Sequence, residues 1–154
     1  MHDNGFALAV IDAADTQAPE ISGVHWCALE PAADRLAPLK EALRVLGARG
    51  LPTVVTLPPA SYSLVQIESP DLPDDELREA SRWRVGDLVD FPIEDAVIDV
   101  FRLPASRRAG APQLLYVVVA RSAEVERLVD LLAGAGLEIE AIDIAEMALR
   151  NLTL

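Results

Sequence analysis

Seven short apolar runs, set apart by turn residues and amphipathic stretches, constrain the fold of this 154-residue chain more than any other feature. Runs of this length, rich in β-branched residues and bounded by Gly, Pro, Asp and Ser, are typical of β-strands. The predicted strands are 6–12, 20–29, 52–57, 62–68, 96–103, 113–120 and 138–144.

The stretches between these runs predict four helices. Leu36, Leu39, Leu43 and Leu46 recur at steps of three and four residues, which places them on one face of a helix. Asp34 suits the N-cap of that helix, and the glycine after Leu46 ends it. The predicted helices are 34–46, 74–90, 123–135 and 145–152. The resulting order, ββαβ–βαββ–αβα, predicts a mixed α/β protein.

The charge balance excludes several kinds of partner. The chain has 25 acidic and 13 basic residues, a net charge of −12, so a phosphate backbone would repel it and no nucleic-acid partner is expected. The longest apolar run, 114–120, is far shorter than the about 20 residues of a membrane-spanning helix, so no membrane insertion is expected. One Cys and two His argue against a metal site built from those residues.

No motif in the sequence predicts catalysis or a cofactor. Phosphate-binding turns of the GxGxxG or GxxxxGK[ST] type do not occur. His25 and Cys27 lie two apart on a predicted strand, so they share a face but are too far apart for a nucleophile and its base. Carboxylate pairs such as Asp87 and Asp90 are expected as solvated surface in so acidic a chain. We therefore predict no catalytic, cofactor-binding or metal-binding residue.

Two residues of the predicted helix 74–90 stand out. Trp83 lies near the edge of its apolar face, formed by residues 77, 80, 81, 85 and 88, and either packs under the following loop or stays open as a partner contact. Arg84 is expected on the inward side, where it either extends its stem along the apolar surface with the charged end in water or pairs with a carboxylate such as Asp99.

Residues 57–103 carry a recognisable pattern. A strand is followed by Pro-x-x-Pro-x-x-Glu-Leu from position 70, by Glu-Ala-x-Arg-Trp from 79, and by Asp-Phe-Pro-Ile-Glu-Asp from 90. This pattern, continued by residues 117–152, resembles the PilM family of type IV pilus assembly proteins, and most closely its MshI members in MSHA pilus biogenesis.

The resemblance implies an actin-like, ribonuclease H-like fold similar to that of the cell-division protein FtsA. In this chain, residues 1–60 and 121–154 would form an incomplete first actin-like subdomain. Residues 61–120 would form an inserted strand–helix–strand–strand domain of the SHS2 type. The chain would match the N-terminal half of a longer protein.

The family's phosphate turn is absent or broken in this sequence. In one alignment residues 3–5 are the tail of a truncated turn, and in the other Asp12 takes the phosphate position but Ala14 replaces the required Gly. We therefore expect no nucleotide binding and no enzymatic activity. If the family's first strand is missing, its neighbours keep open edges, and weak self-association is expected.

The function implied by the resemblance is that of a cytoplasmic adaptor held at the inner-membrane face by its partners. Family members grip the N-terminal tail of a PilN-like inner-membrane protein. The residues expected to form the groove for this tail are Tyr62, Leu64, Trp83, Asp87, Phe91 and Pro92. The alternatives are an actin-like ATPase that needs the missing half, and the cytoplasmic domain of a type II secretion inner-membrane protein.

Overall fold

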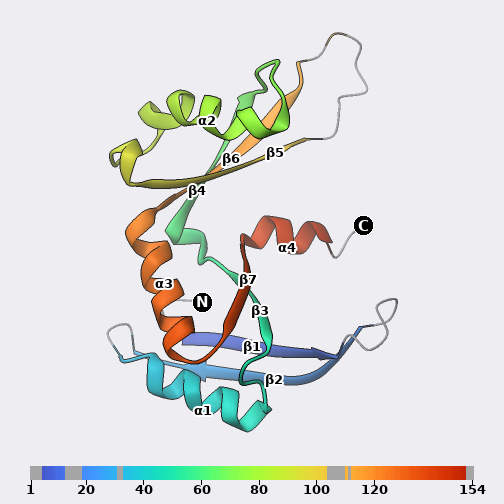
Figure 1. Ribbon diagram of the computed structural model, residues 1–154, viewed down its shortest axis with the longest axis vertical. Coiled ribbons are helices and arrows are strands. Elements are labelled where there is room, and N and C mark those ends of the chain that lie inside the picture. The colour runs from blue at the N-terminus through green and yellow to red at the C-terminus, as the bar shows by residue number, and fades with distance from the viewer. Residues whose placement is uncertain (1–4, 13–18, 31–32, 104–109, 111, 152–154) are drawn as a thin grey trace. The chain divides into compact units, whose positions relative to one another are not determined.

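The computed structural model describes residues 5–12, 19–30, 33–103, 110 and 112–151. Its strands are β1 (Gly5–Asp12), β2 (Glu20–Ala28), β3 (Pro52–Thr56), β4 (Tyr62–Glu68), β5 (Ala96–Arg102), β6 (Leu114–Arg121) and β7 (Glu138–Asp143) (Figure 1). Its α-helices are α1 (Leu36–Leu46), α2 (Asp74–Val85), α3 (Ser122–Gly134) and α4 (Ala145–Asn151), and three short 3-10 turns are η1 (Pro59–Ser61), η2 (Gly86–Leu88) and η3 (Ile93–Asp95). The seven strands and four helices that the sequence predicts are all present.

The chain forms two compact units. One consists of two segments, Met1–Pro58 and Arg127–Leu154, and is called the split unit here. The other, the continuous unit, is the single stretch Pro59–Glu126, which contains the predicted inserted domain 61–120.

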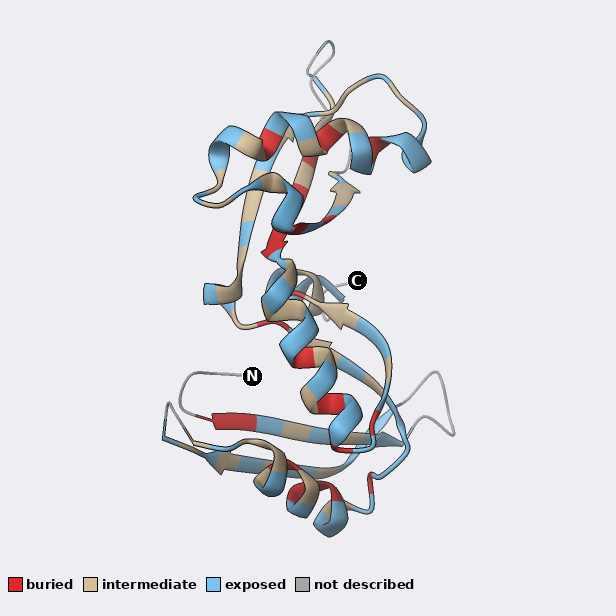
Figure 2. Cartoon of the chain, turned by 60° about the vertical axis from the view of Figure 1, so that its left-hand side comes forward, coloured by how far each residue is buried: buried red, intermediate tan, exposed pale blue. Residues whose placement is uncertain are grey.

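The continuous unit is a three-stranded antiparallel sheet with α2 on one face. Its strand order is β4-β6-β5, so β6 lies in the centre. Leu115, Val117 and Val119 of β6 alternate along the strand and are completely buried, in contact with the cluster that includes Leu77 and Val85 of α2. Figure 2 shows buried positions in red on the helix and strands of this unit. This alternation is what period-2 patterning predicts for a sheet covered on one face.

Helix α2 is shorter than predicted. The sequence predicts a helix over 74–90, but α2 ends at Val85 and the chain tightens into η2. Leu88, expected on the inward face, is 58% exposed instead. The reason is that a 3-10 turn rotates each residue further about the axis than an α-helix does, which takes Leu88 off the apolar stripe.

The split unit contains two separate two-stranded sheets. β1 pairs with β2 antiparallel, and β3 pairs with β7 parallel. Helix α1 packs against β2 through its buried leucines, Leu39 and Leu43, and Figure 1 shows it alongside the β1–β2 hairpin. Gly47, at φ 64°, ends α1 in the left-handed conformation that glycine adopts without strain.

The start of α1 differs slightly from expectation. Arg35 occupies the N-cap position, and Asp34, predicted there, accepts a hydrogen bond from the Leu36 N–H at 3.0 Å. Asp34 therefore accepts from a free backbone N–H group of the first turn, although it lies one residue before the N-cap position.

Most of the predicted exposed loop 104–112 lies outside the described residues, as do residues 3, 4 and 14 of the phosphate-turn alignments.

Candidate functional site

An open pocket of about 340 Å³ lies within the continuous unit. It is bounded by the start of β4, by the loop after η2 and by the end of β6. Tyr62 and Phe91, two of the six residues that the sequence predicts for partner binding, both line it. The fold thus brings to one pocket two residues that are 29 positions apart in the sequence.

Arg121 holds the loop after η2 against the end of β6. Its guanidinium carbon lies 4.1 Å from the centroid of the Phe91 ring, a cation–π contact. Its Nη2 donates a hydrogen bond to Asp90 Oδ1 at 3.0 Å, in an ion pair. Arg121 and Asp90 were not among the predicted site residues. No periodic pattern could reveal them, because their contact spans 31 positions.

Trp83 does not pack under the following loop, because it is 76% exposed, and its contact with a partner stays a prediction. The buried residues of α2 are Leu77, Ser81 and Val85, and Trp83 lies away from this stripe. A large aromatic side chain held open on a helix is characteristic of protein-binding surfaces. Asp87, four positions further along the chain, is exposed as well.

The arginines of α2 are engaged away from Asp87. Arg78 pairs with Asp99 at 3.1 Å. Arg82 donates to the carbonyl of Ile93 at 2.8 Å, and Arg84 donates to the carbonyl of Glu68 at 2.9 Å. The predicted pairing of Arg84 with Asp99 is therefore wrong. Arg78 lies within reach of that carboxylate, whereas Arg84 is exposed and reaches the end of β4.

The other predicted site residues have different surroundings. Leu64 pairs with Val118 in the sheet register, while its neighbour Val65 packs on the buried core. Because side chains alternate along a strand, Leu64 lies on the opposite face of the sheet from α2. Pro92 is exposed and immediately precedes η3.

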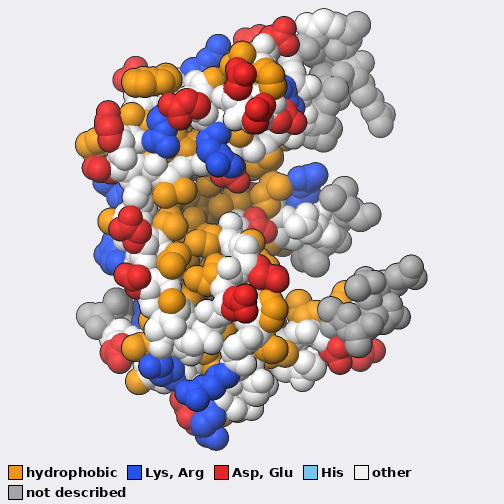
Figure 3. All heavy atoms as spheres, viewed as in Figure 1, with side chains coloured by type: hydrophobic (Ala, Val, Ile, Leu, Met, Phe, Trp, Pro, Cys, Tyr) orange, Lys and Arg blue, Asp and Glu red, His pale blue; other side chains and the backbone are white. Residues whose placement is uncertain are grey.

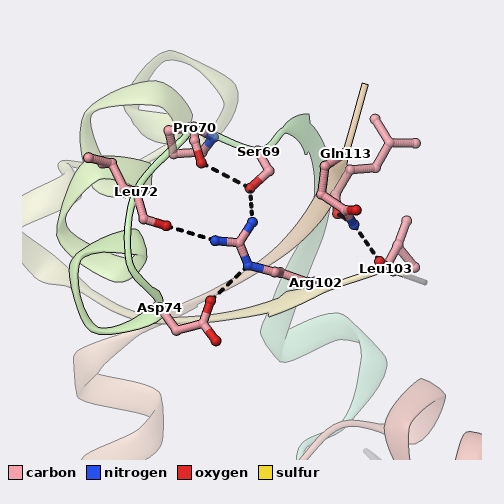
Figure 4. A network of polar contacts seen from close by, with 8 residues as sticks. Ser69, Pro70, Leu72, Asp74, Arg102, Leu103 and Gln113 are labelled. Atoms are coloured by element: carbon pink, nitrogen blue, oxygen red, sulfur yellow. Dashed lines mark hydrogen bonds and ion pairs between the residues drawn. The ribbon is translucent and has the colours of Figure 1, made fainter. Parts of the chain in front are cut away.

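A second network fixes the start of α2. Figure 4 shows Arg102 of β5 donating to three oxygens: Asp74 Oδ1 at 2.7 Å, Ser69 Oγ at 2.7 Å and the Leu72 carbonyl at 2.8 Å. Nearby, Gln113 donates to the carbonyl of Leu103. These contacts hold the turn before α2 against β5, and with it the helix that carries Trp83.

The surface of the continuous unit is acidic. Residues 59–126 contain 13 acidic and 7 basic residues, a formal charge of −6. Figure 3 shows red carboxylate side chains on this unit, at the top of the view, interspersed with blue Lys and Arg side chains. In the part of the chain that the structure describes, no group of three or more His, Cys, Asp and Glu is placed to hold a metal ion. None of the described helices is both long and apolar enough to cross a bilayer.

Comparisons with known proteins identify the fold. No family model matches the chain, and no curated protein matches it. It is similar to a solved structure described as a PilM-PilN type IV pilus biogenesis complex, with a TM-score of 0.77 and 24% identity over 95% of this chain and 46% of that chain. It is also similar to the cytoplasmic domain of EpsL, an inner membrane component of the type II secretion system of Vibrio cholerae, with a TM-score of 0.66 and 18% identity over 92% of this chain and 52% of that chain.

This likeness confirms the predicted fold class, an α/β actin-like fold with an inserted strand–helix–strand–strand domain. The chain spans about half the length of each of the two chains it matches.

Proposed function

We propose that this chain is a non-enzymatic adaptor of type IV pilus biogenesis, of the MSHA type, at the cytoplasmic face of the inner membrane. It docks the N-terminal tail of a PilN-like inner-membrane protein. The observation that carries the proposal is the likeness to the PilM-PilN complex structure over 95% of the chain.

The proposed docking surface lies on the continuous unit. It comprises Tyr62, Trp83, Asp87, Asp90, Phe91 and Pro92. Trp83 supplies an exposed aromatic anchor, and Phe91 and Tyr62 line a pocket that can accept a side chain of the tail. β4 is an edge strand of its sheet, so an extended tail can add main-chain hydrogen bonds there.

Electrostatics favour a basic tail. The continuous unit carries a formal charge of −6, and the arginines of α2 are engaged away from Asp87. Segments next to a membrane on its cytoplasmic side are enriched in Lys and Arg. Attraction between such a tail and this surface raises the association rate, and it weakens as salt is added.

The proposal includes no catalytic step and no nucleotide. The sequence has no Gly-rich phosphate turn, and the phosphate turn of the resembled family is either truncated at residues 3–5 or, in the other alignment, has Ala14 in place of the required Gly. The role assigned to the chain is therefore positioning of a partner.

A second candidate function is supported by the likeness to the cytoplasmic domain of EpsL. In that case the chain would serve a type II secretion system and would bind a different inner-membrane partner. The tail would dock through the same kinds of contact, and only its sequence would differ.

The test measures binding of synthetic tail peptides from PilN-like proteins and from type II secretion inner-membrane proteins by calorimetry. Trp83→Ala is expected to weaken binding of the cognate tail about tenfold or more, as loss of an interface anchor does. Trp26→Ala is the matched control, because Trp26 is 55% exposed but belongs to the split unit. Unchanged affinity in Trp83→Ala, or no binding of either tail, would overturn the proposal. Preference for the secretion tail would favour the second candidate.

A further inference from the structure

The pocket of about 340 Å³ in the continuous unit contains one carboxylate that the proposed docking surface does not include. Glu124, in the first turn of α3, lines this pocket and is half-buried. Within the described residues, Glu124 makes no hydrogen bond and no ion pair. A half-buried carboxylate has lost part of its hydration, and a cation that enters the pocket would compensate for this loss.

The other two charges of the pocket neutralise each other. Asp90 and Arg121 both line it and form an ion pair at 3.0 Å. The guanidinium carbon of Arg121 also lies 4.1 Å from the centroid of the Phe91 ring. Arg121 is therefore committed to the loop after η2, although Glu124 is only three positions away from it in the sequence. Two acidic lining residues and one basic one give the pocket a formal charge of −1.

Two hydroxyl groups add hydrogen-bond acceptors to the pocket. Ser61 and Ser63 line it, and neither hydroxyl is hydrogen-bonded to another residue that the structure describes. Ser63 is the register partner of Val119, a completely buried residue that lines the same pocket. Register partners share a face of the sheet, so the side chains of Ser63 and Val119 lie on the face that α2 covers. One unpaired carboxylate and two hydroxyl oxygens complement a cation with several N–H donors.

An arginine side chain meets this requirement better than a lysine side chain does. Its planar guanidinium has five N–H donors, so it can bind a carboxylate through two parallel hydrogen bonds and still donate to hydroxyl oxygens. The ammonium of lysine has three donors and is more strongly hydrated. Leu88 and Val89 also line the pocket and offer apolar contact to the methylene groups of an arginine stem.

We propose that this pocket binds the guanidinium group of one arginine side chain, with Glu124 as its counter-ion. The arginine belongs to the extended tail that docks on the continuous unit, so this inference rests on the proposed function. Segments next to a membrane on its cytoplasmic side are rich in Arg and Lys. Glu124 is thus a specificity-determining residue, which selects tails that carry an arginine within reach of the pocket.

The first test uses a probe that contains no tail. N-acetyl-arginine methylamide is titrated into the ¹⁵N-labelled full chain, and amide chemical shifts are followed by NMR. The citrulline analogue is the control, because it has nearly the same shape and no charge. We expect saturable shifts in 61–63, 89–91 and 121–124, and about tenfold weaker binding of the citrulline analogue. Equal binding of the two compounds, or shifts confined to other residues, would overturn the proposal.

A pair of variants identifies the counter-ion. Glu124→Gln and Glu126→Gln change the net charge equally, but Glu126 is exposed on α3 and does not line the pocket. The arginine compound should bind about tenfold more weakly to Glu124→Gln and with unchanged affinity to Glu126→Gln. The citrulline compound should bind the parent chain and Glu124→Gln equally, which a purely structural role of Glu124 would not produce. An equal loss in both variants would show that only net charge matters and would overturn the proposal.

Calorimetry with the tail peptides separates this inference from the proposed function. Each arginine of the cognate tail is replaced in turn by citrulline. One replacement should weaken binding to the parent chain about tenfold and cause no loss in Glu124→Gln. Tail binding that requires Trp83 but neither Glu124 nor any arginine would overturn the inference and leave the proposed function standing. Binding of the arginine compound in the pocket without binding of any tail would overturn the proposed function and support the arginine site.

Discussion

Replacing Ser81 by Ala is expected to stabilise the protein. Ser81 is completely buried on the sheet-facing side of α2, and its Oγ has no hydrogen-bond partner in the described part of the chain. A buried hydroxyl without a partner costs about 1–3 kcal/mol. Alanine also has the higher helix propensity, by a few tenths of a kcal/mol. The variant should therefore gain about 1–2 kcal/mol, which raises Tm by roughly 2–8 °C in a chain of this size.

The assay is urea unfolding followed by far-UV circular dichroism, with thermal unfolding as a second measurement. Ser63→Ala is the control, because Ser63 is exposed on β4 and its loss should change stability by no more than about 0.5 kcal/mol. The denaturant slope of Ser81→Ala should match that of the parent chain, since the surface exposed on unfolding is nearly the same. A loss of stability in Ser81→Ala would refute the reasoning, because it would mean that the hydroxyl has a partner in the folded protein.

Three further predictions concern the core, the turn before α2 and nucleotide. Leu115→Ala should lower the free energy of unfolding by about 2–5 kcal/mol, because it leaves a cavity beneath α2, and a loss below 1 kcal/mol in urea unfolding would contradict the burial described. Arg102→Ala should cost about 1 kcal/mol, since its side chain is partly exposed, and Arg102→Lys should not restore this, because one ammonium cannot reach the three acceptors. Recovery of full stability in the lysine variant would show that only the charge matters. Millimolar ATP with magnesium should leave Tm unchanged, and a concentration-dependent rise in a thermal shift assay would reveal the nucleotide site that we propose is missing.

Local patterns were enough to predict the elements of the fold. The leucine stripe of α1 and the alternation along β6 determine which face of each element is buried, and both are visible within a few residues. The end of α2 was harder to predict, because Gly86 is compatible both with a continuing helix and with the 3-10 turn that the chain adopts.

Contacts between distant residues could not be predicted in the same way. The pairing of Arg78 with Asp99 and the contact of Arg121 with Phe91 each join segments more than 20 positions apart. Choosing among the many carboxylates and arginines of this chain requires the register of the strands, which the sequence does not specify. The same limit applies to the pocket, since only the folded sheet brings Tyr62 and Phe91 to the wall of one pocket.

The division of the chain into one continuous and one split unit has a consequence for its synthesis. Residues 59–126 leave the ribosome as a complete sequence for one sheet and its helix. The first segment of the split unit has by then been made, but β3 pairs with β7, which is translated only after the continuous unit. Since domains generally fold as they are completed, the inserted unit can reach its native state first, while the segment made before it must wait for its partner strand.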